Sequence, residues 1–219
     1  MARPLVDLWP MAGVRVVLGD LELRFLDDEL LVELADLAAE GVHDPDAMPF
    51  LVPWTRGTPD EVRRSVLQYQ WRLRAEAGQA KCGLELAVLR DGELLGVQGL
   101  YTERFAVTRA AETGSWLGRR FQGQGVGTQM RLAILHLIFD GLRAERATTS
   151  AFVDNAASTG VTRNLGYRDN GEDVAVRDDA SVVSRRYVLD RASWRARPDE
   201  QRPPVTLEGV DALRGFLGA

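Results

Sequence analysis

The residues most able to do chemistry form a glycine-rich segment, residues 116–128, in the second half of the chain. Gly123, Gly125 and Gly127 stand at alternate positions between an expected strand end and a long apolar helix pattern. Glycine lets the backbone approach a ligand closely, and the first turn of a helix leaves N–H groups unbonded at the positive end of its dipole. Such a loop can bind a phosphate or pyrophosphate with few charged side chains.

The spacing of the glycines narrows the choice of phosphate ligand. The GxxxxGK[ST] pattern of nucleotide kinases and GTPases is absent. The GxGxxG dinucleotide pattern also fails, because Thr128 stands where its last glycine would be. That pattern belongs to an early strand–helix–strand unit, whereas this loop follows several expected strands. A kinase or a dehydrogenase is therefore disfavoured.

A second polar segment follows about thirty residues later, at residues 154–158 and 163–167. Asn155 stands at an expected helix start, where its side chain can cap the helix, contact a ligand or do both. Gly166 follows the expected helix as an ordinary C-terminal cap.

These two segments together resemble the coenzyme A site of the GNAT N-acetyltransferase superfamily. Residues 122–127 match its Q/R-x-x-G-x-G/A signature, and the second segment resembles the N-x-x-S … K-x-G-F/Y pattern of the RimJ/RimL-like branch, which acylates protein N-termini and related amines. Residues 21–24, 53–54 and 114–117 also look like that branch. The resemblance covers roughly residues 14–190.

The resemblance implies a GNAT acyl-CoA N-acyltransferase fold and acetyl-CoA or succinyl-CoA as the cofactor. The strand before the glycine loop would hold the pantetheine arm through its backbone, and the loop amides would hold the pyrophosphate. The implied cofactor-binding residues are Trp116, Leu117, Gly118, Gln122, Gly123, Gln124, Gly125, Val126, Gly127, Thr128, Asn155 and Ser158.

The reaction implied is direct attack of a neutral primary amine on a thioester. It needs a base for the amine, a donor for the oxyanion and a proton for the thiolate. Glu112 matches the family's strand glutamate and is the predicted base, acting directly or through water, with Glu103 as second choice. The Leu117 N–H is the predicted oxyanion donor. Thr162 stands where many GNAT enzymes carry a tyrosine acid, so Ser158 or water is expected to protonate the thiolate.

The expected acceptor is a small-molecule amine or a peptide or protein amine. Its pocket should draw on the loop that carries His43, Met48 and Trp54, with Glu103 as a further contact. His43 could contact the acyl carboxylate if the donor were succinyl-CoA. The alternative hypothesis is a non-catalytic CoA-binding sensor or structural protein with a degenerate site, because Ser115 and Thr162 depart from the family pattern.

Composition limits the other function classes. The formal net charge is −5, which argues against broad contact with nucleic acid. Cys82 is the single cysteine, so no internal disulfide is expected, and His43 and His136 are too few to predict a metal site. We find no signal-peptide pattern and no run of about 18 apolar residues, so we expect a cytoplasmic protein without a membrane segment.

The expected elements form a mixed α/β (α+β) sheet, mainly antiparallel and twisted, flanked by helices, with one parallel step around the long helix. Strands are predicted at 21–26, 83–89, 94–101, 104–108, 112–118, 147–153 and 182–189, and helices at 28–40, 58–76, 126–142 and 155–165. An Asp-Gly turn at 91–92 should join two of the strands.

The expected domain organisation is a GNAT domain over residues 1–194, a charged linker over 195–204 and a strand–helix appendage over 205–219. This tail carries Val205, Leu207, Leu213 and Leu217. It could cover an edge of its own sheet or pair with a second subunit in a homodimer.

Overall fold

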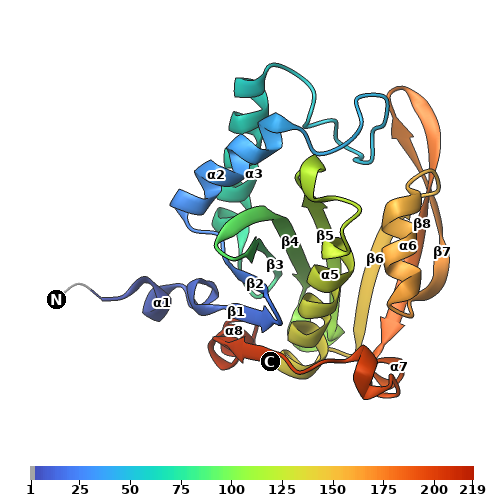
Figure 1. Ribbon diagram of the computed structural model, residues 1–219. Coiled ribbons are helices and arrows are strands. Elements are labelled where there is room, and N and C mark those ends of the chain that lie inside the picture. Colours follow the sequence, from blue (N-terminus) through green and yellow to red (C-terminus); the bar gives the residue numbers. More distant parts are fainter. Residues whose placement is uncertain (1–2) are drawn as a thin grey trace.

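The computed structural model describes residues 3–219 and is built around one nine-stranded sheet, ordered β7-β8-β6-β5-β4-β3-β2-β1-β9 (Figure 1). Each strand pair is antiparallel except β5–β6, which is parallel. The strands are β1 (Arg15–Leu18), β2 (Leu21–Phe25), β3 (Lys81–Arg90), β4 (Glu93–Glu103), β5 (Ala110–Leu117), β6 (Arg146–Phe152), β7 (Arg168–Arg177), β8 (Ala180–Asp190) and β9 (Thr206–Glu208). The predicted fold class is confirmed.

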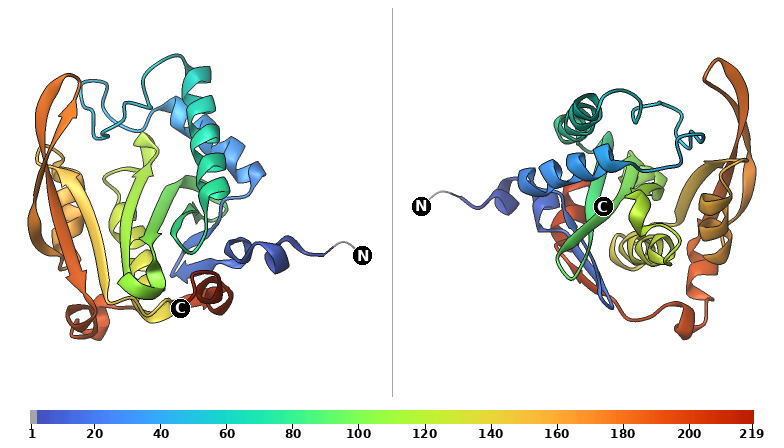
Figure 2. Two further views of the ribbon diagram at one scale, coloured as in Figure 1. Left: turned by 180° about the vertical axis from the view of Figure 1, so that it is seen from behind. Right: turned by 45° about the horizontal axis from the view of Figure 1, so that its top comes forward.

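Helices cover both faces of this sheet (Figure 2). They are α1 (Leu5–Leu8), α2 (Asp28–Glu40), α3 (Pro59–Glu76), α4 (Phe105–Thr108), α5 (Val126–His136), α6 (Ala156–Asn164), α7 (Arg191–Arg195) and α8 (Val210–Phe216). The helices α2 and α3 bury an apolar cluster against Ala87, Leu89 and Val97 on one face. On the other face α5 buries Ile134 and its apolar neighbours against Leu84 and Leu86.

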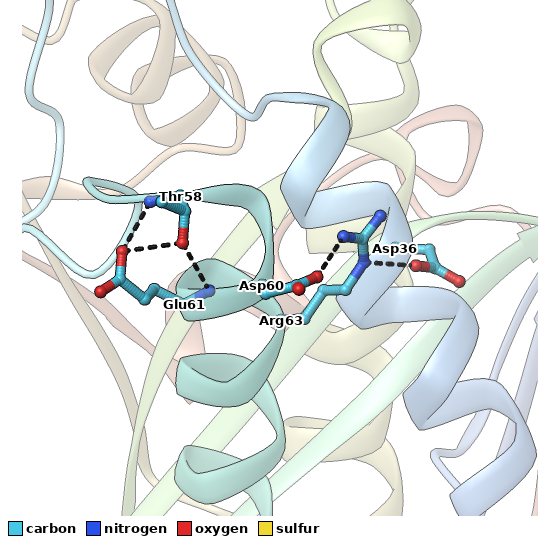
Figure 3. Close-up of polar contacts among 5 residues, drawn as sticks. All are labelled: Asp36, Thr58, Asp60, Glu61 and Arg63. Carbon is cyan, nitrogen blue, oxygen red and sulfur yellow. Dashed lines mark hydrogen bonds and ion pairs between the residues drawn. The ribbon is translucent and has the colours of Figure 1, made fainter.

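The start of α3 is specified locally by the sequence. The Thr58 hydroxyl accepts from the backbone N–H of Glu61, and the Glu61 carboxylate accepts from the backbone N–H of Thr58 at 2.7 Å, which is a reciprocal capping box. Figure 3 shows Arg63 one turn further on, between Asp60 of its own helix and Asp36 of α2. The guanidinium donates to these carboxylates at 2.9 Å and 2.6 Å, so it joins the two helices.

Two sequence predictions differ from the structure, and two strands were not predicted. The strand predicted at 104–108 is wrong, because these residues form the short helix α4, with Arg104 and Arg109 in the left-handed region at φ 44° and 48° on either side of it. The helix predicted to reach residue 142 keeps α-helical bonding only to His136 and then continues as a π-helical turn, Leu137–Gly141. The strands β1 and β7 were not predicted.

The C-terminal segment closes one edge of the sheet. β9 pairs antiparallel with β1, and the Arg15 guanidinium lies 3.1 Å from the Glu208 carboxylate. Leu213 and Leu217 of the last helix are 0% and 1% exposed. The tail therefore covers its own sheet edge, which is one of the two arrangements left open by the sequence. Over residues 3–219, no helix is long and apolar enough to cross a membrane.

Candidate active site

The parallel strands β5 and β6 separate along their length, and this separation creates the site. Their pairing covers only residues 110–112 against 146–148, although both strands continue beyond it (Figure 1). At the vertex, the Thr113 hydroxyl donates to the Thr148 carbonyl at 3.2 Å and the Thr149 hydroxyl donates to the Thr113 carbonyl at 2.9 Å. Past these two bonds the facing backbones of the strands are unpaired with each other, and an extended ligand can lie between them as a strand does.

The glycine loop lies at the open end of this wedge and presents N–H groups. Gly123 and Gly125 adopt φ 72° and 81°, a conformation that only glycine enters without strain, and an added Cβ at either would meet open space. In the described part of the chain, no hydrogen-bond acceptor meets the backbone N–H of Val126 or Gly127 at the start of α5. These groups are the orphan donors of a helix start, and they suit an anion such as a pyrophosphate.

One cavity of about 1530 Å³ joins the wedge to the glycine loop. It is lined by most of the predicted residues, namely His43, Met48, Trp54, Trp116, Leu117, Gln122, Gly123, Gly125, Gly127, Thr128, Asn155 and Ser158. The other predicted residues do not line it: Gly118, Gln124, Val126, Glu103 and Glu112. Val126 is buried in the core at 1% exposure, and the Gln124 amide donates to the Arg120 carbonyl. Segments far apart in the sequence are thus brought together at one site.

The backbone of Leu117 faces the wedge. The next residue, Gly118, donates its N–H to the Leu95 carbonyl at 2.9 Å, on the side of β4. Because successive N–H groups of a strand point to opposite sides, the Leu117 N–H points toward β6. The Leu117 carbonyl on the same side accepts from the Gln122 amide at 2.9 Å, and this bond fixes the loop to the strand.

Asn155 and Ser158 sit at the start of α6. The Asn155 side chain accepts from the Ser158 N–H at 3.0 Å, so it is a helix cap. Thr162, one turn on, is fully buried and donates its hydroxyl to the Ser158 carbonyl at 2.8 Å. This bond turns the Thr162 hydroxyl into the helix, while the residues of the first turn line the cavity.

A row of aromatic rings forms the roof of the cavity. His43, Phe50, Trp54 and Trp116 follow one another with ring centroids 5.9, 5.0 and 5.5 Å apart. Both His43 ring nitrogens are engaged, since Nδ1 donates to the Asp44 carbonyl and Nε2 bonds the Thr55 hydroxyl, each at 2.7 Å. His43, which the sequence predicted to contact the acyl carboxylate, would have to break one of these hydrogen bonds to contact a ligand.

The roof is tied to the far side of the cavity by two arginines. The Arg56 guanidinium donates to the Asp178 carboxylate at 2.5 Å, and Arg177 donates to the Met48 carbonyl at 2.7 Å. Figure 1 shows the result, a loop that runs from α2 across the top of the sheet to the hairpin of β7 and β8. The roof therefore spans the wedge from one side to the other.

Arg131 of α5 is a buried cation in the wall of the cavity. It is 4% exposed and donates to the hydroxyls of Thr149 and Ser115, each at 3.2 Å. Among residues 3–219 no carboxylate lies within ion-pair distance of it, and its Nε has no hydrogen-bond partner. A buried guanidinium without an anion is costly, and a bound anion would offset that cost. The sequence analysis did not single out this residue.

The buried carboxylate that lines the cavity is not the one that the sequence analysis selected as the base. Glu112 is exposed, directly across from Tyr101 in the β4–β5 ladder, and its pKa is raised by partial burial and by the charge of Glu103. Glu85 of β3, which was not predicted, lines the cavity and is 9% exposed. The available signal was its position as the one charged residue in the apolar run 82–89.

Comparison with known proteins identifies the family of this chain. A family model described as an acetyltransferase (GNAT) domain matches residues 20–168. The chain belongs to the GNAT acetyltransferase family, as expected from the glycine loop.

Particular relatives agree with the expected RimJ/RimL-like branch. YdaF of Bacillus subtilis (strain 168), provisionally named a ribosomal N-acetyltransferase, is 31% identical over 90 residues, which are 41% of this chain and 49% of YdaF. The chain thus matches about half the length of this curated relative.

Among solved structures, Mycobacterium smegmatis RimJ in complex with CoA-disulfide is similar with a TM-score of 0.68 at 20% identity, over 89% of this chain and 93% of RimJ. RimL, a ribosomal L7/L12 alpha-N-protein acetyltransferase in complex with coenzyme A, is similar with a TM-score of 0.61 at 22% identity, over 81% and 97%. These likenesses establish the shared fold.

Proposed function

We propose that this protein is an acyl-CoA-dependent N-acyltransferase that transfers an acyl group from coenzyme A to a primary amine. One observation carries the proposal: the β5–β6 wedge, with its unpaired backbones, and Gly127 of the glycine loop, whose amide has no acceptor among the described residues, line the same cavity. An extended pantetheine arm suits the wedge, and a pyrophosphate suits the amides. The cytoplasm, where such cofactors are made and used, is the expected compartment.

The chain's own groups supply the steps of direct amine attack. The Leu117 N–H points into the wedge and is the proposed donor to the oxyanion of the tetrahedral intermediate. Positioning of the amine against the thioester contributes much of the rate in such a reaction. The roles predicted for Glu112 as base and for Ser158 as acid stay predictions.

We infer that the acceptor is a protein or peptide amine. The similarity to YdaF supports this class, since that relative is named for ribosomal proteins. Residues of the roof, 43–54, and of the helix α3 line the cavity, and they are the proposed walls of the acceptor site. A small-molecule amine is the second candidate.

Acetyl-CoA is the proposed donor, in line with the family. A single observation favours succinyl-CoA as a second candidate, namely the buried, unpaired guanidinium of Arg131 beside Ser115. A terminal carboxylate on the acyl group would give that cation a partner. If Arg131 binds the succinyl carboxylate, the wild-type protein should bind succinyl-CoA more tightly than acetyl-CoA, and Arg131→Met should lose this preference. Equal affinity of the wild-type protein for both would exclude this role of Arg131.

The test is calorimetric titration of the purified protein with CoA, acetyl-CoA and succinyl-CoA. Gly125→Glu places a side chain at φ 81° and a negative charge where the pyrophosphate is proposed, so affinity should fall at least about tenfold, or about 1.4 kcal/mol. Gly215→Glu, at an open position in α8, is the matched control and should bind normally. No binding of any of the three by the wild-type protein would refute the proposal. Binding without transfer to any amine would instead support the non-catalytic sensor.

A further inference from the structure

A buried carboxylate lines the cavity where the helix α3 covers β3. Glu85 of β3 is 9% exposed, and its carboxylate accepts from the Tyr101 hydroxyl, from the side-chain amide of Gln70 and from the Tyr69 hydroxyl at 3.4 Å. Each of these donors is neutral. Across residues 3–219, no lysine or arginine pairs with this carboxylate. A buried anion that is held only by neutral groups is costly unless a cation joins it.

The Tyr101 side chain packs against two glycines, Gly99 of its own strand and Gly114 of β5. A Cβ added at Gly99 would lie 2.5 Å from the Tyr101 hydroxyl oxygen, and one at Gly114 would lie 3.4 Å from its ring. Glycine at both positions leaves room for the phenol to lie across β4 and β5. Gly114 also lines the cavity, beside the predicted pantetheine strand. The network therefore reaches from α3 and β3 to the strand that borders the wedge.

The titratable groups that contact Glu85 are two tyrosines, and burial raises the pKa of all three side chains. Burial raises the pKa of Glu85 itself, and it raises the pKa of Tyr69 to about 12. The pKa of Tyr101 lies well above its usual range, through burial and then the charge of Glu85. Both phenols therefore stay protonated as donors.

The cations on the covering helix are engaged elsewhere. Arg72 lies over the Tyr69 ring at 5.7 Å, and Arg74 donates to Asp28 and to the Leu26 carbonyl. Glu103 and Glu112 do not line the cavity. Asp44, Asp46, Asp154 and Asp178 also line the cavity but are exposed, so Glu85 is the buried carboxylate in its wall.

We propose that Glu85 binds the ammonium group of the acceptor and takes up its proton, with Tyr101, Tyr69 and Gln70 holding the carboxylate in place. This proposal rests on the proposed N-acyltransfer. The ammonium transfers one proton to the Glu85 carboxylate, and the neutral nitrogen attacks the thioester carbonyl, so that a C–N bond forms and the C–S bond breaks. The second proton lost by the nitrogen goes to the departing thiolate, and Glu85 returns its proton to water.

A raised pKa suits this role, because a base works best when its pKa lies near the operating pH. The carboxylate also defines a substrate class, since a buried anion selects a cationic acceptor over a neutral one. A peptide with a free N-terminal amine meets this requirement, and the same peptide with an acetylated N-terminus does not.

The experiment compares Glu85→Gln, Tyr101→Phe, Glu112→Gln and Glu22→Gln in acetyl transfer. Thiol release from acetyl-CoA is followed from pH 6 to 10, with spermidine and a short peptide with a free N-terminal amine as acceptors. The N-acetylated peptide is the negative control for the acceptor. Glu22 lies on β2 of the same sheet and does not line the cavity, so its variant should behave as wild type. Thermal unfolding and the Kd for acetyl-CoA are measured for each variant.

Glu85→Gln should lower kcat/KM for the amine at least about 100-fold, with the Kd for acetyl-CoA unchanged. Tyr101→Phe removes a bond that lowers the pKa of Glu85, so the acid limb of its pH–rate profile should move to higher pH. Activity within about threefold of wild type in Glu85→Gln, or a loss confined to Glu112→Gln, would overturn the role proposed for Glu85. Neither result would overturn the proposed acyl transfer. A wild-type protein that binds acetyl-CoA but acetylates neither amine would refute the proposed transfer as well.

Discussion

Gly99 is predicted to control both the stability of the protein and the geometry of the acceptor side of the cavity. It lies on β4, two residues before Tyr101 and on the same face of the sheet. A Cβ at this position would lie 2.5 Å from the Tyr101 hydroxyl oxygen and 2.8 Å from two of its ring carbons. Contacts this short cannot persist, so Gly99→Ala must displace the phenol from Glu85.

The size of the effect follows from the kind of clash. Overfilling a packed region costs about 1–3 kcal/mol, and each kcal/mol shifts the Tm of a chain of this size by about 2–4 °C. We therefore expect Gly99→Ala to lower the Tm by about 2–12 °C. The rate of acetyl transfer should fall as well, because Tyr101 no longer holds the carboxylate. Affinity for acetyl-CoA should not change, since its proposed contacts lie on other elements.

Scanning calorimetry and the thiol-release assay check this prediction. Gly215→Ala is the control, because a Cβ there meets open space. A double-mutant cycle with Tyr101→Ala isolates the clash, since removal of the ring should leave Gly99→Ala without further cost. A Tm loss no larger than that of the control, or one that persists in the Tyr101→Ala background, would refute the reasoning.

Three further predictions concern stability. The raised native pKa of Glu85 gives a stabilisation that is present below its unfolded pKa and is lost as pH rises through the native value. Glu85→Gln should therefore gain Tm relative to wild type as pH rises above the ordinary titration range of a carboxyl group, and a pH-independent difference would contradict this. Thr58→Ala removes the capping box of α3 and should cost about 1 kcal/mol in chemical denaturation, whereas exposed Thr206→Ala should cost little. Leu213→Ala empties a fully buried site of α8 and should cost about 2–5 kcal/mol without changing the Kd for CoA; Leu5→Ala, 59% exposed, is its control.

Elements with a local cause were predictable from the sequence. Asp27 caps α2 through a bond from the Leu30 N–H at 2.9 Å, and Thr58 caps α3, as their positions before apolar helix patterns indicated. The turn at Asp91 and Gly92 has both residues at positive φ, 51° and 81°, which is the reason for its Asp-Gly sequence. In each case the residues that form the feature are neighbours in the chain.

Features that depend on residues far apart in the sequence were not predicted. The apolar segment 105–108 suits a strand by composition, but two left-handed arginines at its ends allow the short helix α4 that connects β4 to β5. The edge strand β7 alternates few apolar residues, and it forms because it pairs with β8 along most of its length. Periodicity alone does not carry this information.

Glu85 is the clearest case at the site. Within a strand, a lone carboxylate is most simply interpreted as a group that faces solvent. It is buried here because α3 lies over β3 and supplies Tyr69 and Gln70, while Tyr101 arrives from β4. Each donor lies 15 or 16 positions from Glu85 in the sequence, and only the fold brings them to it.

The two sides of the cavity are built in different ways, and this difference has a functional consequence. The proposed cofactor side consists of backbone groups of one short stretch, the end of β5 and the start of α5, so the sequence marks it with glycines. The acceptor side uses side chains from α3, β3, β4 and the aromatic roof. Side-chain substitutions there can change charge and shape without moving the backbone that is proposed to bind CoA. The acceptor side is therefore where one GNAT domain can diverge from another in substrate while the proposed CoA site is kept.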